Sequence, residues 1–458
     1  MSQDPRRADA LHDGPADQPR PSSGWPQTLK TGALVGGLSL LALFQLSGCG
    51  DSSSPGDNGT SIAPGASSGS LTVEYFDPET KNLKKSEGET LYGKYIGKRT
   101  WWHENQQVAK EGTYDSQGNK TGPWKEYHRT NGLTAASYTY AQDLLTGAMT
   151  RWHPNGEKAE EGRYADGLKE GEWLSWYLNG RERSKARFEK GKQVGQFISW
   201  HDDGSVLERG SYENGERVGV HEGFAPNGER IARAEYESGV PIGKIEGWYE
   251  DGERRQLQPM EGGERHGDEE AWWPNGQERY TKKWERGRRV GEDAQFHMNG
   301  SRHIAARYVD GVLEGVFREW HDNGQLGGLV TFEGGDMVGI GRNWHPNGQI
   351  AVMDSYAANE PLGIHQTWYD DGTRQQFGAL VGEKQVETWF IWDSAGQLLE
   401  DGPRASGFFR DGKFVRPLND EEKAQAAELQ TNQAPVDVPS EAVDPLKLYD
   451  EKGDARPR

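Results

Sequence analysis

The sequence predicts an all-β protein, an elongated single antiparallel sheet of stacked β-hairpin repeats that are each 24 residues long. A glycine recurs every 24 residues over twelve positions, from Gly132 to Gly396. A fixed period of this size is typical of a repeat architecture. The segments between turns are about seven to nine residues long, which suits strands and is too short for most helices.

Each copy of the repeat is centred on a unit whose clearest example is Trp152-His153-Pro154-Asn155-Gly156. Asn-Gly and Asp-Gly pairs at such turns predict type I′ hairpins, because that turn needs positive φ at both central residues. Strands that are joined in sequence by tight turns pair antiparallel, so successive copies should build one meandering sheet.

Aromatic residues recur with the same 24-residue period as the turn glycine. One lies four positions before it, and a second lies eight positions after it in most copies. Side chains alternate faces along a strand, so the small residue Gly162 and the second ring Tyr164 share a face. Rings packed over strand glycines are a known stabilising arrangement. We therefore expect an apolar face of rings laid over glycines. Its structural aromatic ladder comprises Trp152, Trp176, Trp200, Trp248, Trp272, Trp320, Trp344, Trp368 and Trp392.

Exposed rings have a second interpretation, since a row of them could stack on the sugars of cell-wall glycan. A further set of aromatic residues directly follows ladder positions and should point to the opposite face. An exposed apolar patch there would mark a partner site. We take this set as the candidate binding surface: Tyr177, Tyr249, Trp273 and Tyr369.

The charge balance excludes one class of partner. Acidic residues number 72 against 53 basic ones, a net charge of −19. Nucleic-acid binders carry a basic face, so we expect no nucleic-acid partner. The same acidity argues against electrostatic adhesion to anionic lipid.

Motifs of catalysis are not found, and we expect neither an enzyme nor a cofactor. The sequence lacks the zincin, nucleophile-elbow and phosphate-loop patterns. Histidines recur beside the ladder, as at His153 and His201. Equivalent residues of adjacent copies lie two strands apart, about 9.5 Å, whereas zinc holds its ligands at about 2 Å. We therefore expect repeat histidines and no metal site.

The N-terminal 49 residues predict a secretory signal, with basic residues before an apolar run that ends near Leu46. Leu46-Ser47-Gly48-Cys49 resembles the bacterial lipobox. The resemblance implies that Cys49 is lipidated and anchors the protein in the bacterial cell envelope. Gly50 does not resemble an inner-membrane retention signal, which favours the outer membrane.

The rest of the chain divides by composition. Residues 50–70 form a flexible tether rich in Ser, Gly and Pro. The repeats occupy residues 71–416, and residues 417–458 form a polar, mostly disordered tail. Within that tail, Asn419 as N-cap and the acidic residues after it predict a short helix up to Gln430.

The pattern aromatic-x-x-Asn-Gly, followed by Tyr-x-x-Gly-x-x-x-Gly, resembles the MORN repeat variant of bacterial proteins grouped as the YwqK-like toxin–antitoxin family. The resemblance covers roughly residues 90–415. It implies an elongated antiparallel sheet of stacked hairpins, and the family name implies an antitoxin.

Three functions remain open at this point. The first is a membrane-anchored, non-catalytic repeat scaffold that binds a protein partner. The second is an antitoxin or immunity protein that neutralises one cognate toxin, which would be basic. The third is a glycan-binding protein of the envelope.

Overall fold

The computed structural model describes residues 69–435, and there the chain is nearly all β, with strands that pair antiparallel into an open sheet and a single helix. The predicted fold class is confirmed. Cys49 and the tether up to residue 68 lie outside the described residues, as does the tail from residue 436 on. Between residues 69 and 435, no helix is long and apolar enough to cross a membrane.

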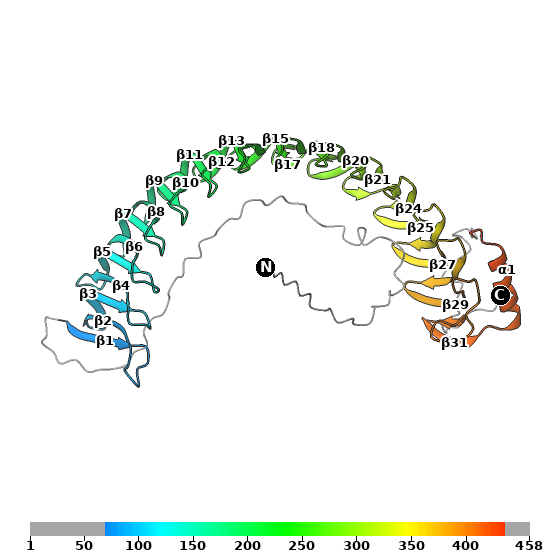
Figure 1. The fold of residues 1–458 in the computed structure, drawn as a ribbon, viewed down its shortest axis with the longest axis horizontal. Helices are drawn as coiled ribbons and strands as arrows, with labels where there is room; N and C mark the ends of the chain where they lie inside the picture. The colour runs from blue at the N-terminus through cyan, green and yellow to red at the C-terminus, as the bar shows by residue number, and fades with distance from the viewer. Residues whose placement is uncertain (1–68, 436–458) are drawn as a thin grey trace, which may run out of the picture. The chain divides into compact units, whose positions relative to one another are not determined.

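Two compact units divide the chain, with a boundary between Val290 and Gly291. Each is a succession of hairpins (Figure 1). The first unit holds β1 Ser70–Tyr75, β2 Lys84–Leu91, β3 Lys94–Trp102, β4 Val108–Tyr114, β5 Lys120–Tyr127, β6 Thr134–Ala141, β7 Leu144–Trp152, β8 Lys158–Ala165, β9 Leu168–Trp176, β10 Glu182–Glu189, β11 Lys192–Trp200, β12 Val206–Glu213, β13 Glu216–Phe224, β14 Arg230–Glu237, β15 Val240–Trp248, β16 Arg254–Glu261, β17 Glu264–Arg265, β18 Gly267–Trp272 and β19 Glu278–Glu285.

The second unit holds most of β20 and all later elements. They are β20 Arg288–Phe296, β21 Arg302–Val309, β22 Val312–Leu313, β23 Gly315–Trp320, β24 Leu326–Glu333, β25 Asp336–Trp344, β26 Ile350–Ala357, β27 Glu360–Trp368, β28 Arg374–Val381, β29 Lys384–Ile391, β30 Gly407–Arg410, β31 Lys413–Pro417 and α1 Asp420–Thr431.

The turn at the repeat unit is not the type I′ turn that the Asn-Gly pair predicts. The Gly156 N–H donates to the His153 carbonyl at 2.9 Å, and the His153 N–H donates to the Glu157 carbonyl at 2.8 Å. Gly156 has a φ of 90°, whereas Asn155 is not in the positive-φ region. This is a type I turn followed by a left-handed glycine, which favours Pro154 at its second position. The type I′ turn occurs at the other end of the strand, where Asp166 and Gly167 both have positive φ.

The core of the sheet is a column of side chains over the strand glycines, but the ladder tryptophans do not form it. An added Cβ on Gly162 would lie 2.3 Å from the Trp173 ring. Because side chains alternate along β9, Trp173 and Trp176 point to opposite faces. The ladder predicted to cover the glycines is therefore on the other side of the sheet. We call the face of Trp173 the ring face and the face of Trp176 the ladder face. The same overlap pairs Gly112 with Trp124, Gly210 with His221 and Gly378 with Trp389.

Side-chain volumes on the ring face compensate each other. The small position lies eleven residues before the column residue in the regular copies, and in several copies a small side chain at one position accompanies a larger one at the other. Gly pairs with Trp in one copy, Ala186 pairs with Phe197 in the next, and Val330 pairs with Gly341 in a later one. In these apolar pairs close packing leaves room for one large side chain, whereas Gln258 and Glu269 occupy both positions of a polar copy.

The second rings complete the ring face, where Tyr164 meets Trp173 edge-on at 5.1 Å between centroids. Trp173 in turn meets Phe188 of the next copy at 6.2 Å. Edge-to-face pairs at such distances stabilise beyond simple burial. The prediction that Tyr164 shares a face with Gly162 is confirmed, since both contact Trp173.

Residues 418–435 correct part of the prediction of a polar, mostly disordered tail, the remainder of which lies outside the described residues. Asn419 caps α1 with its side chain, and Glu422 reaches back to the Asn419 backbone, which forms a capping box. Helix α1 lies beside the last strands (Figure 1), and Leu418 and Ala426 are buried against Phe390 and Trp392. The helix that the sequence predicts is therefore confirmed, and it covers the ladder face of the last strands.

Candidate binding surface: the ladder face and its edges

Where the residue after a ladder aromatic is His or Tyr, its side chain links one copy to the next. The His153 Nε2 atom lies 3.0 Å from the carbonyl oxygen of Trp176, and the His201 Nε2 atom lies 2.9 Å from that of Phe224. A carbonyl can only accept, so Nε2 carries the proton and donates. His128, His297, His321 and His345 make the equivalent contact at 2.8 to 3.0 Å.

Three of the four residues predicted as an exposed contact surface occupy this same linking position. The hydroxyls of Tyr177, Tyr249 and Tyr369 donate to the carbonyls of Trp200, Trp272 and Trp392 at 2.7, 2.8 and 3.0 Å. All three side chains are half-buried. Trp273 is also half-buried, and the Arg279 guanidinium lies 4.6 Å from its ring centroid. The three tyrosines are therefore links between copies, and none of the four residues is exposed.

Turn asparagines form a second row of links. The Asn155 amide donates to the Leu178 carbonyl of the next turn at 2.7 Å, while its oxygen accepts from the Glu157 N–H at 3.1 Å. Asn179 and Asn227 donate in the same way. At Asp203, Asp251 and Asp371 the carboxylate keeps the acceptor role within the turn. A carboxylate has no N–H, so these copies lose the donor to the next turn.

The ladder rings themselves are half-buried, as the linking tyrosines are, apart from Trp368 and Trp392, which are both 2% exposed near α1. In three copies of the first unit, the residue two positions after the turn glycine places a cation over the ring of the next copy. Lys158 Nζ lies 5.5 Å from the Trp176 centroid, and the Arg230 guanidinium lies 4.5 Å from that of Trp248. Arg254 and Trp272 repeat the arrangement at 6.0 Å. Such pairs are favourable and keep the cation at the surface.

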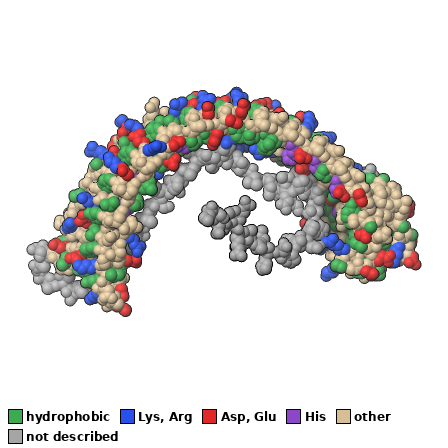
Figure 2. All heavy atoms as spheres, viewed as in Figure 1, with side chains coloured by type: hydrophobic (Ala, Val, Ile, Leu, Met, Phe, Trp, Pro, Cys, Tyr) green, Lys and Arg blue, Asp and Glu red, His purple; other side chains and the backbone are tan. Residues whose placement is uncertain are grey.

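Acidic and basic side chains are interspersed on the face of the molecule that Figure 2 shows. On the ladder face of the first unit, Arg209 pairs with Glu222 at 2.7 Å and Lys185 pairs with Glu172 at 2.8 Å. Exposed pairs of this kind add little to stability. Hydrogen bonds from Arg209 and Arg230 outweigh the effect of burial on Glu222, so the pKa of its carboxyl lies below the ordinary value. The ladder face of the first unit therefore carries both acidic and basic side chains and is not of a single charge sign.

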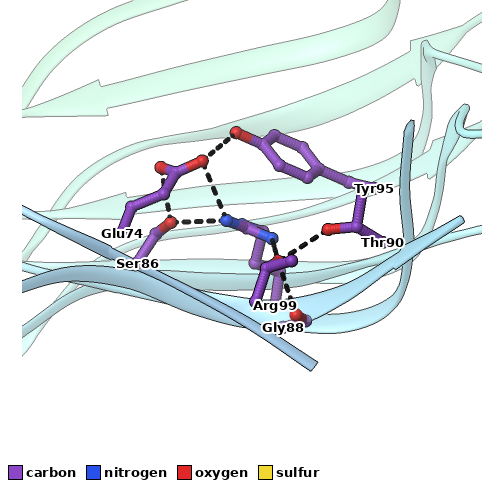
Figure 3. A network of polar contacts seen from close by, with 7 residues as sticks. Glu74, Ser86, Gly88, Thr90, Tyr95 and Arg99 are labelled. Carbon is purple, nitrogen blue, oxygen red and sulfur yellow. Dashed lines mark hydrogen bonds and ion pairs between the residues drawn. The ribbon is translucent and has the colours of Figure 1, made fainter. Parts of the chain in front are cut away.

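The first copy ends in a polar network in place of a ring (Figure 3). Arg99 is fully buried and packs over Gly88, the position that an aromatic side chain covers elsewhere. Its guanidinium donates to Ser86 at 2.7 Å and pairs with Glu74 at 3.1 Å. Burial raises the pKa of Glu74, but hydrogen bonds from Tyr95 and Ser86 and the charge of Arg99 outweigh it. The carboxylate stays ionised and satisfies the buried cation.

No group of three or more potential metal ligands is found in residues 69–435. The ring face does hold an Asp354–His365 pair at 2.6 Å, but His365 also stacks on Trp389 at 5.3 Å between centroids. Tyr356 donates to the same carboxylate at 3.2 Å. This cluster occupies the position of the ring-and-glycine pair of other copies, and its side chains hydrogen-bond to one another.

Comparison with known proteins gives no family. No family model matches the chain, and no curated protein does. Among solved structures, the chain is similar to the Tc holotoxin pore of Photorhabdus luminescens, with 11% identity, a TM-score of 0.14, and 75% of this chain and 20% of that one covered. A TcdB2–TccC3 crystal structure gives 10% identity, a TM-score of 0.12, and 81% and 24% coverage. The chain thus spans a quarter or less of these structures, and such scores carry no argument. The resemblance to the MORN repeat variant stays a prediction.

Proposed function

We propose that this protein is a membrane-anchored, non-catalytic repeat scaffold that binds a protein partner through the ladder face of its first unit. The observation that carries the proposal is the set of half-buried tryptophans that lie under Lys or Arg in three copies of the first unit: Trp176 with Lys158, Trp248 with Arg230 and Trp272 with Arg254. Trp and Arg dominate the binding energy of protein interfaces. A rim of mixed charges around an aromatic centre is also typical of such interfaces.

Other polar side chains of the repeat are engaged in holding copies together, which supports this choice of surface. The linking histidines, tyrosines and asparagines face the next copy and have their hydrogen-bonding groups engaged there, as His153 and Asn155 show. The ladder rings have no such role in the first unit. The uncovered parts of these rings remain available to a partner, while Lys158 and Arg230 above them pair with Glu161 and Glu222 at 2.6 and 3.1 Å and form part of the charged rim.

Anchoring is the second part of the proposal and rests on the lipobox resemblance at Cys49. Lipidation of that cysteine would hold the repeats at the envelope, with the outer membrane favoured. The test is mass spectrometry of the mature N-terminus together with membrane fractionation of the full chain. We expect a diacylglyceryl mass on Cys49 and release of the Cys49→Ser protein from the membrane fraction. An unmodified cysteine, or membrane retention of the variant, would refute the anchor.

Partner binding is tested by quantitative affinity capture from envelope extracts with the full chain. The test variant carries Lys158→Glu and Arg230→Glu, whose side chains are 51% and 43% exposed, so the fold should tolerate them. The control variant carries Leu144→Glu and Leu168→Glu, both 49% exposed at the opposite turn edge. We expect a stoichiometric protein that the control retains and the test variant loses.

The outcomes separate the three functions. Capture of several envelope proteins supports the scaffold, and one basic protein alone points to an antitoxin. Equal capture by both variants places the interface elsewhere. Co-sedimentation with isolated cell wall, in the absence of any protein partner, would replace the proposal with glycan binding.

A further inference from the structure

The three residues after α1 lie on the ladder face as a short extended peptide. Asn432, the first of them, has a φ of −98° and a ψ of 93°. The Trp368 indole N–H donates to the Gln433 carbonyl at 3.0 Å. The Arg374 Nη2 atom donates to the carbonyls of Asn432 and Ala434 at 3.2 and 2.8 Å. All three contacts end on main-chain oxygens, so Trp368 and Arg374 bind a peptide backbone and not a particular sequence.

This peptide is an outer layer over two buried side chains. Asn432 and Ala434 are exposed, whereas Trp368 is 2% exposed and Arg374 is 0% exposed. One side chain of the peptide contributes, because the Gln433 oxygen accepts from the Arg374 backbone N–H at 2.7 Å. The contacts of the three residues are therefore few and mostly independent of their side chains. A second chain with the same extended backbone has the groups to replace them.

Arg374 is a buried cation without a carboxylate. Its guanidinium donates to the Gln366 side-chain oxygen at 2.7 Å and otherwise to main-chain carbonyls, and none of residues 69–435 pairs a carboxylate with it. Burial lowers the pKa of Arg374 from 12.5 to about 10. Arg99 is equally buried but pairs with Glu74 at 3.1 Å. Because a buried charge is costly unless it is paired, Arg374 suits an anionic ligand better than its present neutral one.

The unused hydrogen-bond donor of Arg374 indicates which anion fits. Its Nε atom is buried and has no hydrogen bond. The Nε and Nη2 atoms form one edge of the guanidinium, and such an edge holds both oxygens of a carboxylate in parallel hydrogen bonds. Nη2 already donates to the Ala434 carbonyl at 2.8 Å. In a chain that ended at this position, that carbonyl would be one oxygen of the terminal carboxylate, and the other oxygen would be the partner that Nε lacks.

We propose that Trp368 and Arg374 form a binding site for the C-terminal carboxylate of a partner protein, whose last residues bind in extended form where residues 432–434 lie. Those residues are a self-ligand that the partner's terminus displaces, because an internal carbonyl brings no charge to Arg374. The inference goes beyond the proposed scaffold surface, which lies in the first unit. Its failure would leave that proposal untouched, since the two sites are tested with different variants.

Binding of a synthetic peptide to the full chain tests the site. The peptide has the sequence of residues 418–434 and is made with a C-terminal acid and, as the matched control, with a C-terminal amide. The receptor carries Ala426→Glu, which places a charge where Ala426 is 1% exposed and so releases α1. By fluorescence anisotropy we expect the acid to bind about tenfold more tightly than the amide, as charge-assisted hydrogen bonds are the stronger ones.

The unchanged chain and an arginine variant are the controls on the receptor. The unchanged chain should bind both peptides roughly a hundredfold more weakly, because its own segment competes at a millimolar effective concentration. Adding Arg374→Met to the Ala426→Glu chain should remove the preference for the acid. Hydrogen exchange shows whether α1 is released while β27 and β28 stay protected, and Leu418→Glu is a second variant for releasing the helix.

Three results would overturn the proposal. They are equal binding of acid and amide, a preference for the acid that persists in Arg374→Met, and no binding of either peptide once α1 is released. Intact mass spectrometry of the mature protein completes the test. A chain that itself ends at Ala434 would assign the carboxylate to this protein and exclude the terminus of a partner.

Discussion

The volume compensation on the ring face predicts how a single added methyl group should act. In Gly162→Ala the new Cβ would lie 2.3 Å from the Trp173 ring, which cannot move freely because Tyr164 and Phe188 pack at its edges. Overpacking costs about 1–3 kcal/mol, whereas replacing a strand glycine by alanine returns about 0.5–1 kcal/mol. We expect Gly162→Ala to destabilise β8 and β9 by roughly 1–2 kcal/mol in net terms.

A compensating change should remove most of that cost. Trp173→Phe alone leaves a cavity over Gly162, and it also loses the Lys169 ammonium, which lies 3.7 Å from the ring centroid. Combined with Gly162→Ala, it recreates the Ala186–Phe197 pair of the next copy. We expect a favourable coupling free energy of about 1–2 kcal/mol between the two changes, as is typical of residues in contact.

Local hydrogen exchange is the suitable assay, because a repeat array does not unfold as one two-state unit. The free energy of opening is measured for amides of β8, β9 and β10 in the wild type, both single variants and the double variant. Trp389→Phe combined with Gly162→Ala is the control, since Trp389 belongs to the second unit. Additive effects in the Gly162–Trp173 cycle, or a Gly162→Ala variant as stable as the wild type, would refute the packing rule.

The remaining predictions concern the links between copies and the C-terminal helix. His153→Tyr should be tolerated, because Tyr177 makes the same link in the next copy, whereas His153→Phe should cost about 1 kcal/mol of local stability by losing one hydrogen bond. Hydrogen exchange of the Trp176 turn compares the two. Asn155→Asp should likewise weaken protection of the Leu178 turn, since it loses the donor that lies 2.7 Å from that carbonyl, and the reverse change Asp251→Asn should strengthen its own turn. Docking of α1 should depend on pH, because hydrogen bonds from Arg416 lower the pKa of the Glu422 carboxyl from 4.5 to about 2. A lowered pKa contributes stability that is complete above the unfolded value and is lost as the pH falls through the folded value, so protection of α1 should decline between pH 4.5 and about 2. Glu422→Gln should abolish that dependence, and an unchanged acid profile in the variant would contradict the assignment.

The strict period predicts the hairpin repeat, because turn chemistry and strand length recur at every copy. Two features escaped sequence reasoning. The column over the glycines contains Trp173, His221 and Glu269 at equivalent positions, so no residue type repeats there. In the apolar copies, the available signal was the inverse size of the residue eleven positions earlier, as in Gly162 and Trp173. The second feature is the peptide-like segment at Gln433, which depends on tertiary contacts that no local pattern encodes.

The prediction that Tyr177, Tyr249 and Tyr369 form an exposed surface was wrong for a related reason. Alternation along the strand correctly separates Tyr177 from Trp176, but it does not reveal that a carbonyl of the next copy lies within 2.7 Å of its hydroxyl. Histidine and tyrosine share the ability to donate from the end of a ring of similar reach. Their interchange at one repeat position, as between His153 and Tyr177, was the available signal.

The most direct test of the proposed function is oxidative footprinting of the ladder in the free protein and in the captured complex. Hydroxyl-radical modification of tryptophans is read by mass spectrometry for Trp176, Trp200, Trp248 and Trp272. The account predicts that a partner lowers their modification while the exposed edge residues Leu144 and Leu168 keep theirs. Unchanged ladder tryptophans in a complex that protects the Leu144 and Leu168 edge would contradict it.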